Sequence, residues 1–296
     1  MKIAVLGYPS LDIIMSINKF EGLGKTTLLF EHELNHYPGG CGLNISVGLK
    51  LLYDVETFPI TTFGTDPGYV EYRDRLLKLG VKLDYIEIVN GKGAYSMIFN
   101  DPTGEQLIFY YPGISEKIHI PKDYKADDFD YLIVTISPWD SIDEILRRSK
   151  NRTKILWSAK IDPASVSDEK LSYICKNVNN IVMNEREANY LLKTLEIPKF
   201  QDLFRINEDL EWMIITRGKN GATLIERNSG EISFPPSKVE KPVDPTGAGD
   251  GFAVGLMGEL SKSNNVEKAI RSAMEIASQV IKYKGAQTIY EKMRGG

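Results

Sequence analysis

The second half of the sequence alternates between short apolar runs and longer amphipathic segments. The apolar runs are rich in Ile, Leu and Val, and each amphipathic segment repeats its apolar residues with helical spacing. The apolar runs span 129–136, 154–159, 180–183 and 211–216, and the helical segments between them span 140–150, 168–177 and 184–195. Strands that alternate with helices pack as parallel strands joined by crossover helices. This half therefore predicts a three-layer α/β/α sandwich around a mostly parallel sheet, which the apolar run 2–7 joins.

Residues 81–111 have a different pattern. They contain three strand-like runs, and a hairpin turn at 101–104 joins the last two. With a strand-like segment before Pro38, they predict a small separate sheet that covers the larger unit. We expect one α/β domain over residues 1–296, with lid strands inserted at about 26–38 and 81–112.

Composition restricts the class of protein. A net charge of −4 and a pI near 5.6 argue against a nucleic-acid or anionic-membrane binder. The two cysteines are far apart and lack metal-type spacing, which indicates a reducing compartment. No apolar run approaches the ~18 residues of a membrane span, and the N-terminal run reaches Asp12 too soon for a signal peptide. We expect a soluble, cytoplasmic protein.

The segment VDPTGAGD, residues 243–250, carries the strongest chemical signal. Its glycines precede a long apolar segment, which predicts a tight loop that opens into a helix with Thr246 as cap. Free N–H groups at a helix start attract phosphate, and Gly247 and Gly249 let it approach the backbone. Asp250 would repel that anion, which fits a carboxylate acting on a second reactant. The alternative is a capped helix whose dipole Asp250 complements.

A second glycine-rich turn starts another helical segment. Gly39 and Gly40 permit close contact with a ligand, and Asn44 follows one helical turn later. Asp12 comes soon after the first strand, where polar ligand-binding groups of α/β sheets lie. A simple turn and helix cap is the alternative for the glycine pair.

Two further patterns indicate other chemistry. Residues 21–27 resemble a phosphate-binding loop, but Lys19 stands where that motif needs glycine. His32 and His36 match the H-E-x-x-H zinc motif, with Glu33 as the base on a helix. A strand would instead place Glu33 on the opposite face from both histidines. A zinc hydrolase is kept as an alternative function.

Four motifs occur in an order that resembles the ribokinase-like PfkB family of sugar and nucleoside kinases. They are Gly39-Gly40 with Asn44, Asn184-x-x-Glu187, Thr216-x-Gly218 and the D-x-T-G-A-G-D motif at 244–250. The resemblance covers nearly the whole chain, and the last motif is highly specific. Pro245, the GAQT at 285–288 and the aromatic-Pro-Gly-Ile after the lid look most like archaeal-type nucleoside kinases.

The resemblance implies a catalytic mechanism. Asp250 would be the base that takes a proton from a substrate hydroxyl, and the backbone amides of Gly247, Ala248 and Gly249 would hold the charge on the γ-phosphate. The residues implied to grip the substrate hydroxyls are Asp12, Gly39, Gly40 and Asn44.

The same resemblance implies a nucleotide site and two cations. The implied ATP-binding residues are Asn184, Thr216, Gly218 and Gly221. Asn184 and Glu187, one turn apart, would organise Mg²⁺ through water. Asp244, with the loop around Gly285, resembles the monovalent-cation site of the family, which would take K⁺.

The distribution of charge suggests the substrate class. No lysine or arginine occurs in residues 8–18, 36–48 or 93–115, whereas a sugar phosphate would need a cation. Aromatic residues in the lid favour a nucleoside, since a base offers a face for stacking. We expect ATP-dependent phosphorylation of a nucleoside 5′-hydroxyl. The alternatives are ribokinase or another sugar kinase, acting on ribose or fructose, and a non-catalytic binding protein. Exposed lid edges suggest a homodimer formed through the lid.

Overall fold

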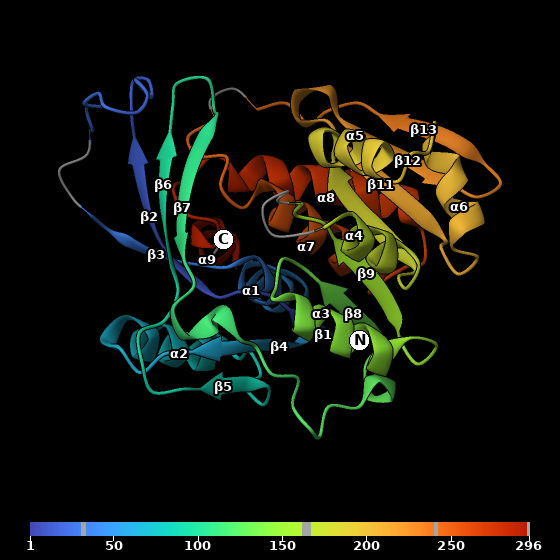
Figure 1. The fold of residues 1–296 in the computed structure, drawn as a ribbon, viewed down its shortest axis with the longest axis horizontal. Helices are drawn as coiled ribbons and strands as arrows, with labels where there is room; N and C mark the ends of the chain where they lie inside the picture. The colour runs from blue at the N-terminus through green and yellow to red at the C-terminus, as the bar shows by residue number, and fades with distance from the viewer. Residues whose placement is uncertain (31–33, 162–166, 240–241, 295–296) are drawn as a thin grey trace.

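The computed structural model describes residues 1–30, 34–161, 167–239 and 242–294. Their central sheet has nine strands in the order β13-β12-β11-β10-β9-β8-β1-β4-β5 (Figure 1). The strands are β1 (Lys2–Leu6), β4 (Glu56–Phe63), β5 (Ile86–Ile88), β8 (Tyr131–Val134), β9 (Lys154–Ser158), β10 (Asn180–Asn184), β11 (Trp212–Thr216), β12 (Ala222–Glu226) and β13 (Gly230–Phe234). All strands from β11 to β5 run parallel, and β12 and β13 extend the sheet as an antiparallel ribbon. The predicted fold class is confirmed.

Helices cover both faces of this sheet because its strands are apolar on both sides. Ile3 and Val5 of β1 belong to one buried cluster, and Ala4 and Leu6 belong to another. The first cluster includes residues of α1 (Cys41–Tyr53), α2 (Pro67–Leu79), α7 (Ala248–Leu260), α8 (Val266–Val280) and α9 (Thr288–Arg294). The second includes residues of α3 (Trp139–Ser149), α4 (Asp168–Cys175), α5 (Glu185–Thr194) and α6 (Leu203–Ile206). Of the helices among these residues, none combines the length and apolar character that a membrane crossing needs.

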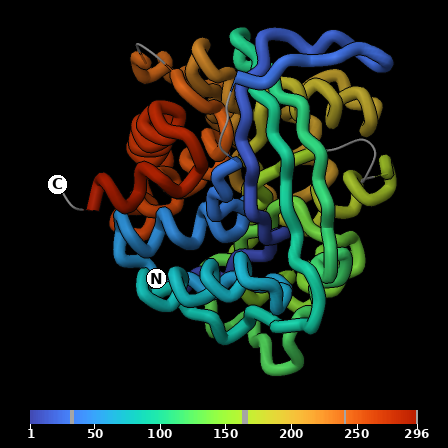
Figure 2. Tube along the Cα trace, turned by 90° about the vertical axis from the view of Figure 1, so that its left-hand side faces the viewer, coloured from blue at the N-terminus to red at the C-terminus, as the bar shows by residue number. Residues whose placement is uncertain are grey.

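A separate four-stranded sheet lies beside the central sheet, and we call it the lid sheet (Figures 1 and 2). Its order is β3-β2-β6-β7, with β2 (Ser10–Ser16), β3 (His36–Gly39), β6 (Tyr95–Asn100) and β7 (Gln106–Tyr111). β2 and β6 run parallel, and the two outer pairs are antiparallel. The division of the chain into one domain with inserted lid strands stays a prediction.

Several elements differ from the sequence-based expectation. Residues 86–88, expected in the lid, pair with Thr61–Phe63 of β4 in the central sheet. The lid sheet gains β2 instead, a strand that the sequence pattern after the apolar run 2–7 did not indicate. The helical pattern of the last segment continues to Lys284, but α8 ends at Val280. A further helix, α9, begins at Thr288, after Gly285 with its φ of 82°. Apolar periodicity marks a strand but not the sheet that the strand joins, which explains the exchange of β2 and β5.

Helix α7 is buried almost all round, as expected for a helix enclosed by other helices. Two glycines allow this close packing. A Cβ at Gly255 would lie 2.5 Å from the Cα of Ala273 in α8, and one at Gly258 would lie 2.2 Å from the Tyr53 ring of α1. The position of α7 therefore depends on the absence of these side chains.

We expect Gly255→Ala to lower the free energy of unfolding by about 1–2 kcal/mol, because overpacking against backbone outweighs the gain in helix propensity. Gly249→Ala is the matched control, since a Cβ at that position of the same helix meets nothing within 4 Å. Urea unfolding of both variants measures the difference. Equal stability of the two would contradict the close packing of α7 on α8.

Candidate active site

The N-terminus of α7 forms the centre of the candidate site. The helix begins at Ala248, and Gly247 caps it with a φ of 81°. A Cβ at Gly247 would lie 2.3 Å from the Cβ of Ala286, so only glycine fits there. The expectation that Thr246 caps the helix is wrong, because Gly247 is the N-cap and no side chain bonds the first N–H groups. The Thr246 hydroxyl instead accepts a hydrogen bond from Gln106 of β7 at 2.9 Å. The helix starts one residue later than a Thr246 cap would require.

The three backbone amides of the expected anion hole differ in their partners. The Ala248 N–H donates to the carbonyl of Pro245 at 3.2 Å. Within the described part of the chain, the N–H groups of Gly247 and Gly249 donate to no acceptor. A helix start with free N–H groups attracts an anion. Gly247 and Gly249 are thus the better donors for a phosphate, and Ala248 is already engaged.

Asp250 lies in the first turn of α7 and contacts α1. Its Oδ2 accepts a hydrogen bond from Nδ2 of Asn44 at 2.7 Å. Burial raises the pKa of the Asp250 carboxyl, while the bond from Asn44 and the charge of Lys160 oppose that shift. A carboxylate with a raised pKa beside a free anion site suits proton transfer.

Asp12 lies on β2 and is 5% exposed. Its Oδ1 accepts the hydroxyl of Ser10 at 2.5 Å, and Ser10 also contacts Ser96 of β6. Burial raises the pKa of Asp12 to about 6, although the Ser10 bond and Lys160 act against the shift. A Cβ at Gly39 would lie 2.1 Å from Oδ2 of Asp12, so the predicted substrate residues Asp12 and Gly39 are in direct contact.

The other two predicted substrate residues, Gly40 and Asn44, lie at the start of α1. Gly40 is its N-cap with a φ of 92°, and a Cβ there would lie 2.5 Å from the carbonyl of Tyr8. Asn44 is buried one turn later, and its amide bonds both Asp250 and Gln287. Asn44 therefore contacts Asp250 directly, which sequence reasoning did not predict.

Sequence reasoning also missed Lys160, which follows β9. The N–H of its neighbour Ile161 donates to Oε1 of Glu187 at 3.2 Å, which holds this loop at the site. The pKa of Lys160 is raised chiefly by Cys41 and to a smaller extent by three carboxylates. These carboxylates are Asp250, Asp12 and Glu187. Burial acts in the opposite direction and lowers the pKa of Lys160. The site therefore has a cation near it after all. Lys160 lies outside residues 8–18, 36–48 and 93–115, whose lack of lysine and arginine suggested a neutral substrate.

Aromatic rings lie on the Asp12 side of the site. Tyr110 of β7 and Tyr8 form a ring pair with centroids 5.4 Å apart. The pKa of Tyr110 is raised by burial and, to a smaller extent, by Tyr8, Cys41 and Asp12, which places its hydroxyl near the site. Phe109 and Tyr111 instead pair with Phe99 and Tyr95 of β6. Tyr110 is thus the lid aromatic associated with Asp12.

A cavity of about 460 Å³ lies on the other side of the α7 N-terminus. It brings together predicted nucleotide and phosphate residues from two distant parts of the chain. These residues are Thr216, Gly218, Gly221, Ala248 and Gly249. Its remaining wall is largely apolar, with Val239, Phe252, Met274, Ala277 and Ile281. A largely apolar slot that ends at the free N–H of Gly249 suits a flat base whose phosphates lie at the helix start.

Asn184 and Glu187 form a capping box at the start of α5. Oδ1 of Asn184 accepts the N–H of Glu187 at 2.9 Å, and Oε2 of Glu187 accepts the N–H of Asn184 at 2.8 Å. The described residues contain no group of three or more His, Cys, Asp or Glu side chains that could hold a metal ion. Mg²⁺ usually keeps several of its waters when a protein binds it. One carboxylate and one amide oxygen therefore fit Mg²⁺ that is bound through water.

Asp244 is fully buried between the lid sheet and the loop after α8. Its Oδ1 accepts Nδ2 of Asn100 and the N–H of Thr246, each at 3.0 Å, and its Oδ2 accepts the N–H of Gly285 at 2.9 Å. Each of these donors is neutral. No cationic side chain is among the donors that the described residues offer to this buried carboxyl group, which fits a monovalent cation nearby.

The zinc alternative finds no support in the described residues. His32 and Glu33 lie outside them, and His36 begins the strand β3 with an exposed side chain. The H-E-x-x-H motif binds zinc from one face of a helix, whereas His36 lies on a strand.

Comparison with known proteins identifies the family. The sequence profile of the pfkB family carbohydrate kinases matches residues 2–293. The chain belongs to the pfkB family of carbohydrate kinases. This pfkB-family kinase is 27% identical to a nucleoside kinase of Methanocaldococcus jannaschii over 292 residues, covering 97% of this chain and 92% of that protein. It is 26% identical to a ribokinase of Bacillus subtilis over 290 residues, covering 96% of this chain and 94% of that protein.

The fold of this pfkB-family kinase is also found in solved structures. The nucleoside kinase of Burkholderia thailandensis in complex with inosine superposes with a TM-score of 0.82 at 24% identity. The match covers 97% of this chain and 93% of that one. This likeness shows a shared fold.

The pKa of Asp12 generates a prediction about stability. The folded chain keeps the Asp12 proton up to about pH 6, whereas the ordinary pKa is 3.8. Ionising the buried carboxyl therefore destabilises the folded state as pH rises through this window. We expect Asp12→Asn to gain thermal stability relative to the wild type between pH 4 and pH 7. A constant difference in melting temperature across that range would contradict the raised pKa.

Proposed function

We propose that this kinase transfers the γ-phosphate of ATP to a hydroxymethyl group, most specifically the 5′-hydroxyl of a nucleoside. The observation that carries the proposal is the Tyr8–Tyr110 ring pair on the Asp12 side of the α7 N-terminus, opposite the apolar cavity. A nucleobase needs an aromatic surface of this kind, and a bare pentose does not. The names of the M. jannaschii and B. thailandensis proteins support the same substrate class.

The proposed reaction uses the two sides of the α7 N-terminus. Asp12 accepts hydrogen bonds from the ribose hydroxyls, and Asp250 takes the proton of the 5′-hydroxyl. The oxygen forms a bond to the γ-phosphorus as the bond between that phosphorus and the β,γ-bridging oxygen breaks, which releases ADP. The free N–H groups of Gly247 and Gly249 stabilise the charge on the transferred phosphoryl group.

Two cations belong to the proposal. Asn184 and Glu187 would hold hydrated Mg²⁺, which neutralises phosphate charge when it is bound. Asp244 would be the carboxylate associated with K⁺, as its burial among neutral donors supports. With or without a bound cation, the Asp244 side chain holds the loop that leads to Asp250, because it accepts a hydrogen bond from the backbone N–H of Thr246.

Sugar phosphorylation is the second candidate. The similarity to the B. subtilis ribokinase favours it, as does Lys160, which supplies a cation to the site. A charged or small sugar would use that lysine rather than the tyrosine pair. A non-catalytic binding protein has less support, because the carboxylate and the glycines at the α7 N-terminus are both present.

We also propose a homodimer through the lid sheet and a cytoplasmic location. Strand β7 is at the edge of the lid sheet, and most of its residues are exposed. An exposed apolar edge strand invites pairing with a second chain. Met97, Ile108 and Phe109 would lie in or near that contact.

Substrate choice is tested with a panel of nucleosides, ribose, fructose and fructose phosphates. We expect ADP release to be fastest with a nucleoside, because only a nucleobase uses the faces of Tyr8 and Tyr110. A coupled spectrophotometric assay gives kcat/KM for each compound. Turnover of sugars with none of the nucleosides would replace the first substrate class with the second.

The base is tested with Asp250→Asn. We expect kcat to fall by about 10²–10⁴-fold, the range of general acid–base catalysis, while nucleoside binding persists. Turnover assays give kcat, and isothermal titration gives the dissociation constant. Asp127→Asn, a change at an exposed surface residue, is the control for removal of one charge. Wild-type turnover by Asp250→Asn would rule out the base assignment.

A further inference from the structure

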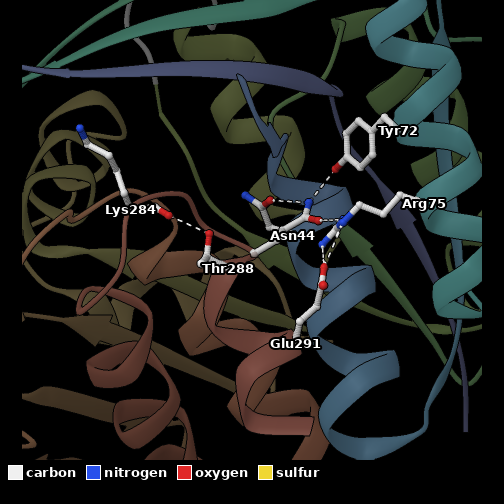
Figure 3. A network of polar contacts seen from close by, with 7 residues as sticks. Asn44, Tyr72, Arg75, Lys284, Thr288 and Glu291 are labelled. Atoms are coloured by element: carbon white, nitrogen blue, oxygen red, sulfur yellow. Dashed lines mark hydrogen bonds and ion pairs between the residues drawn. The ribbon is translucent and has the colours of Figure 1, made fainter. Parts of the chain in front are cut away.

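Gln287 lies between α8 and α9 and is the hub of a buried hydrogen-bond network. Its side chain is 2% exposed. Its Nε2 donates to Oδ1 of Asn44 at 2.9 Å and to the hydroxyl of Tyr72 at 2.6 Å, and its Oε1 accepts Nη1 of Arg75 at 2.6 Å. Figure 3 shows Asn44, Tyr72 and Arg75 converging from α1 and α2. All these bonds join residues that are far apart in the sequence.

The partners of Gln287 allow only one orientation of its amide. A guanidinium donates and never accepts, so Arg75 must face Oε1. The Tyr72 hydroxyl donates its single proton to the carbonyl of Gly39 at 2.9 Å, so it must accept from Nε2. Turning the amide by 180° would place Nε2 against Arg75, with two donors facing each other.

The orientation of Gln287 in turn fixes the amide of Asn44. Because Nε2 of Gln287 donates to Asn44, the atom of Asn44 on that side is Oδ1. Nδ2 of Asn44 therefore points to Asp250, to which it donates at 2.7 Å. The direction of the hydrogen bonds is thus transmitted from Arg75 to the Asp250 carboxylate through two amide side chains, those of Gln287 and Asn44.

We propose that Gln287, oriented by Arg75, is a positioning residue that keeps the donor group of Asn44 directed at Asp250. The inference rests on the proposed function, in which Asp250 is the base. Gln287 acts through Asn44 and does not touch the reactants. Arg75 is itself held by Glu291 of α9, whose Oε1 accepts its Nε at 3.0 Å (Figure 3).

The electrostatic surroundings of Asp250 come from several elements. Titratable side chains reach it from the start of α1, from β2, from the loop after β9, from α2 and from α9. They are Cys41, Asp12, Lys160, Tyr72 and Tyr290. The Asn44 bond lowers the pKa of Asp250 against burial, so loss of that donor raises the pKa further.

Gln287→Glu is the decisive variant because it keeps the size of the side chain and replaces the Nε2 donor with an acceptor oxygen. A carboxylate still accepts from Arg75 but cannot donate to Asn44. Asn44 then turns its Nδ2 toward position 287 and its Oδ1 toward Asp250, so that two acceptors face each other. We expect kcat at pH 7 to fall at least about tenfold, with the acidic limb of the kcat–pH profile displaced upward by about one pH unit. The KM for ATP stays at the wild-type value.

The control is Gln279→Glu, the same chemical change near the end of α8, where Gln279 pairs with Glu275. It should leave both kcat and the pH profile at wild-type values. Arg75→Met is the second variant, because it removes the orienting cation without adding a charge. We expect it to displace the acidic limb in the same direction by a smaller amount. It also keeps the test available if Gln287→Glu does not fold.

The outcomes separate the two proposals. An unmoved pH profile in either folded variant, with Asp250→Asn inactive, overturns the role of Gln287 and leaves the base assignment intact. Wild-type turnover by Asp250→Asn overturns the base assignment, and the role of Gln287 with it. A lower kcat with an unmoved profile would show a merely structural role and would also overturn the inference.

Discussion

The candidate site depends on the packing of α7 against α1. The two helices start from glycine-rich loops at positions about two hundred residues apart, and the hydrogen bond between Asn44 and Asp250 joins their first turns. Gly258 lets α7 approach the Tyr53 ring of α1, and Gly255 lets it approach the backbone of α8. The anion site at Gly247 and Gly249 and the carboxylate at Asp250 are placed by this contact. A change in the crossing of the helices would separate them.

Local sequence carries much of the information about this site. A phosphate site at a helix start is made by backbone N–H groups, and its glycines are adjacent in the chain. The predicted residues Ala248 and Gly249 accordingly line the cavity, beside Gly218 and Gly221, which the resemblance to the family had indicated. The alternation of strands and helices likewise predicts the parallel sheet, since each strand of such a sheet is buried on both faces.

Long-range contacts could not be predicted in the same way. Gln287 meets Asn44 across 243 positions, and neither residue has a local pattern that indicates the other. Lys160 follows an ordinary strand, so a search for cations near the glycine motifs does not find it. The membership of β2 and β5 in their sheets is decided by packing between distant segments. Each of these features depends on the tertiary structure rather than on a run of residues.

The bonds between the lid sheet and the 243–250 loop have a consequence for how the two ligands influence each other. Asn100 and Gln106 flank the lid hairpin, and their amides bond Asp244 and Thr246. Any displacement of that hairpin breaks bonds that shape the phosphate-receiving loop. The position of the hairpin and the shape of that loop are therefore linked through two amide side chains. If a ligand at one of them shifts the other, thermodynamic reciprocity makes the effect on affinity equal in both directions.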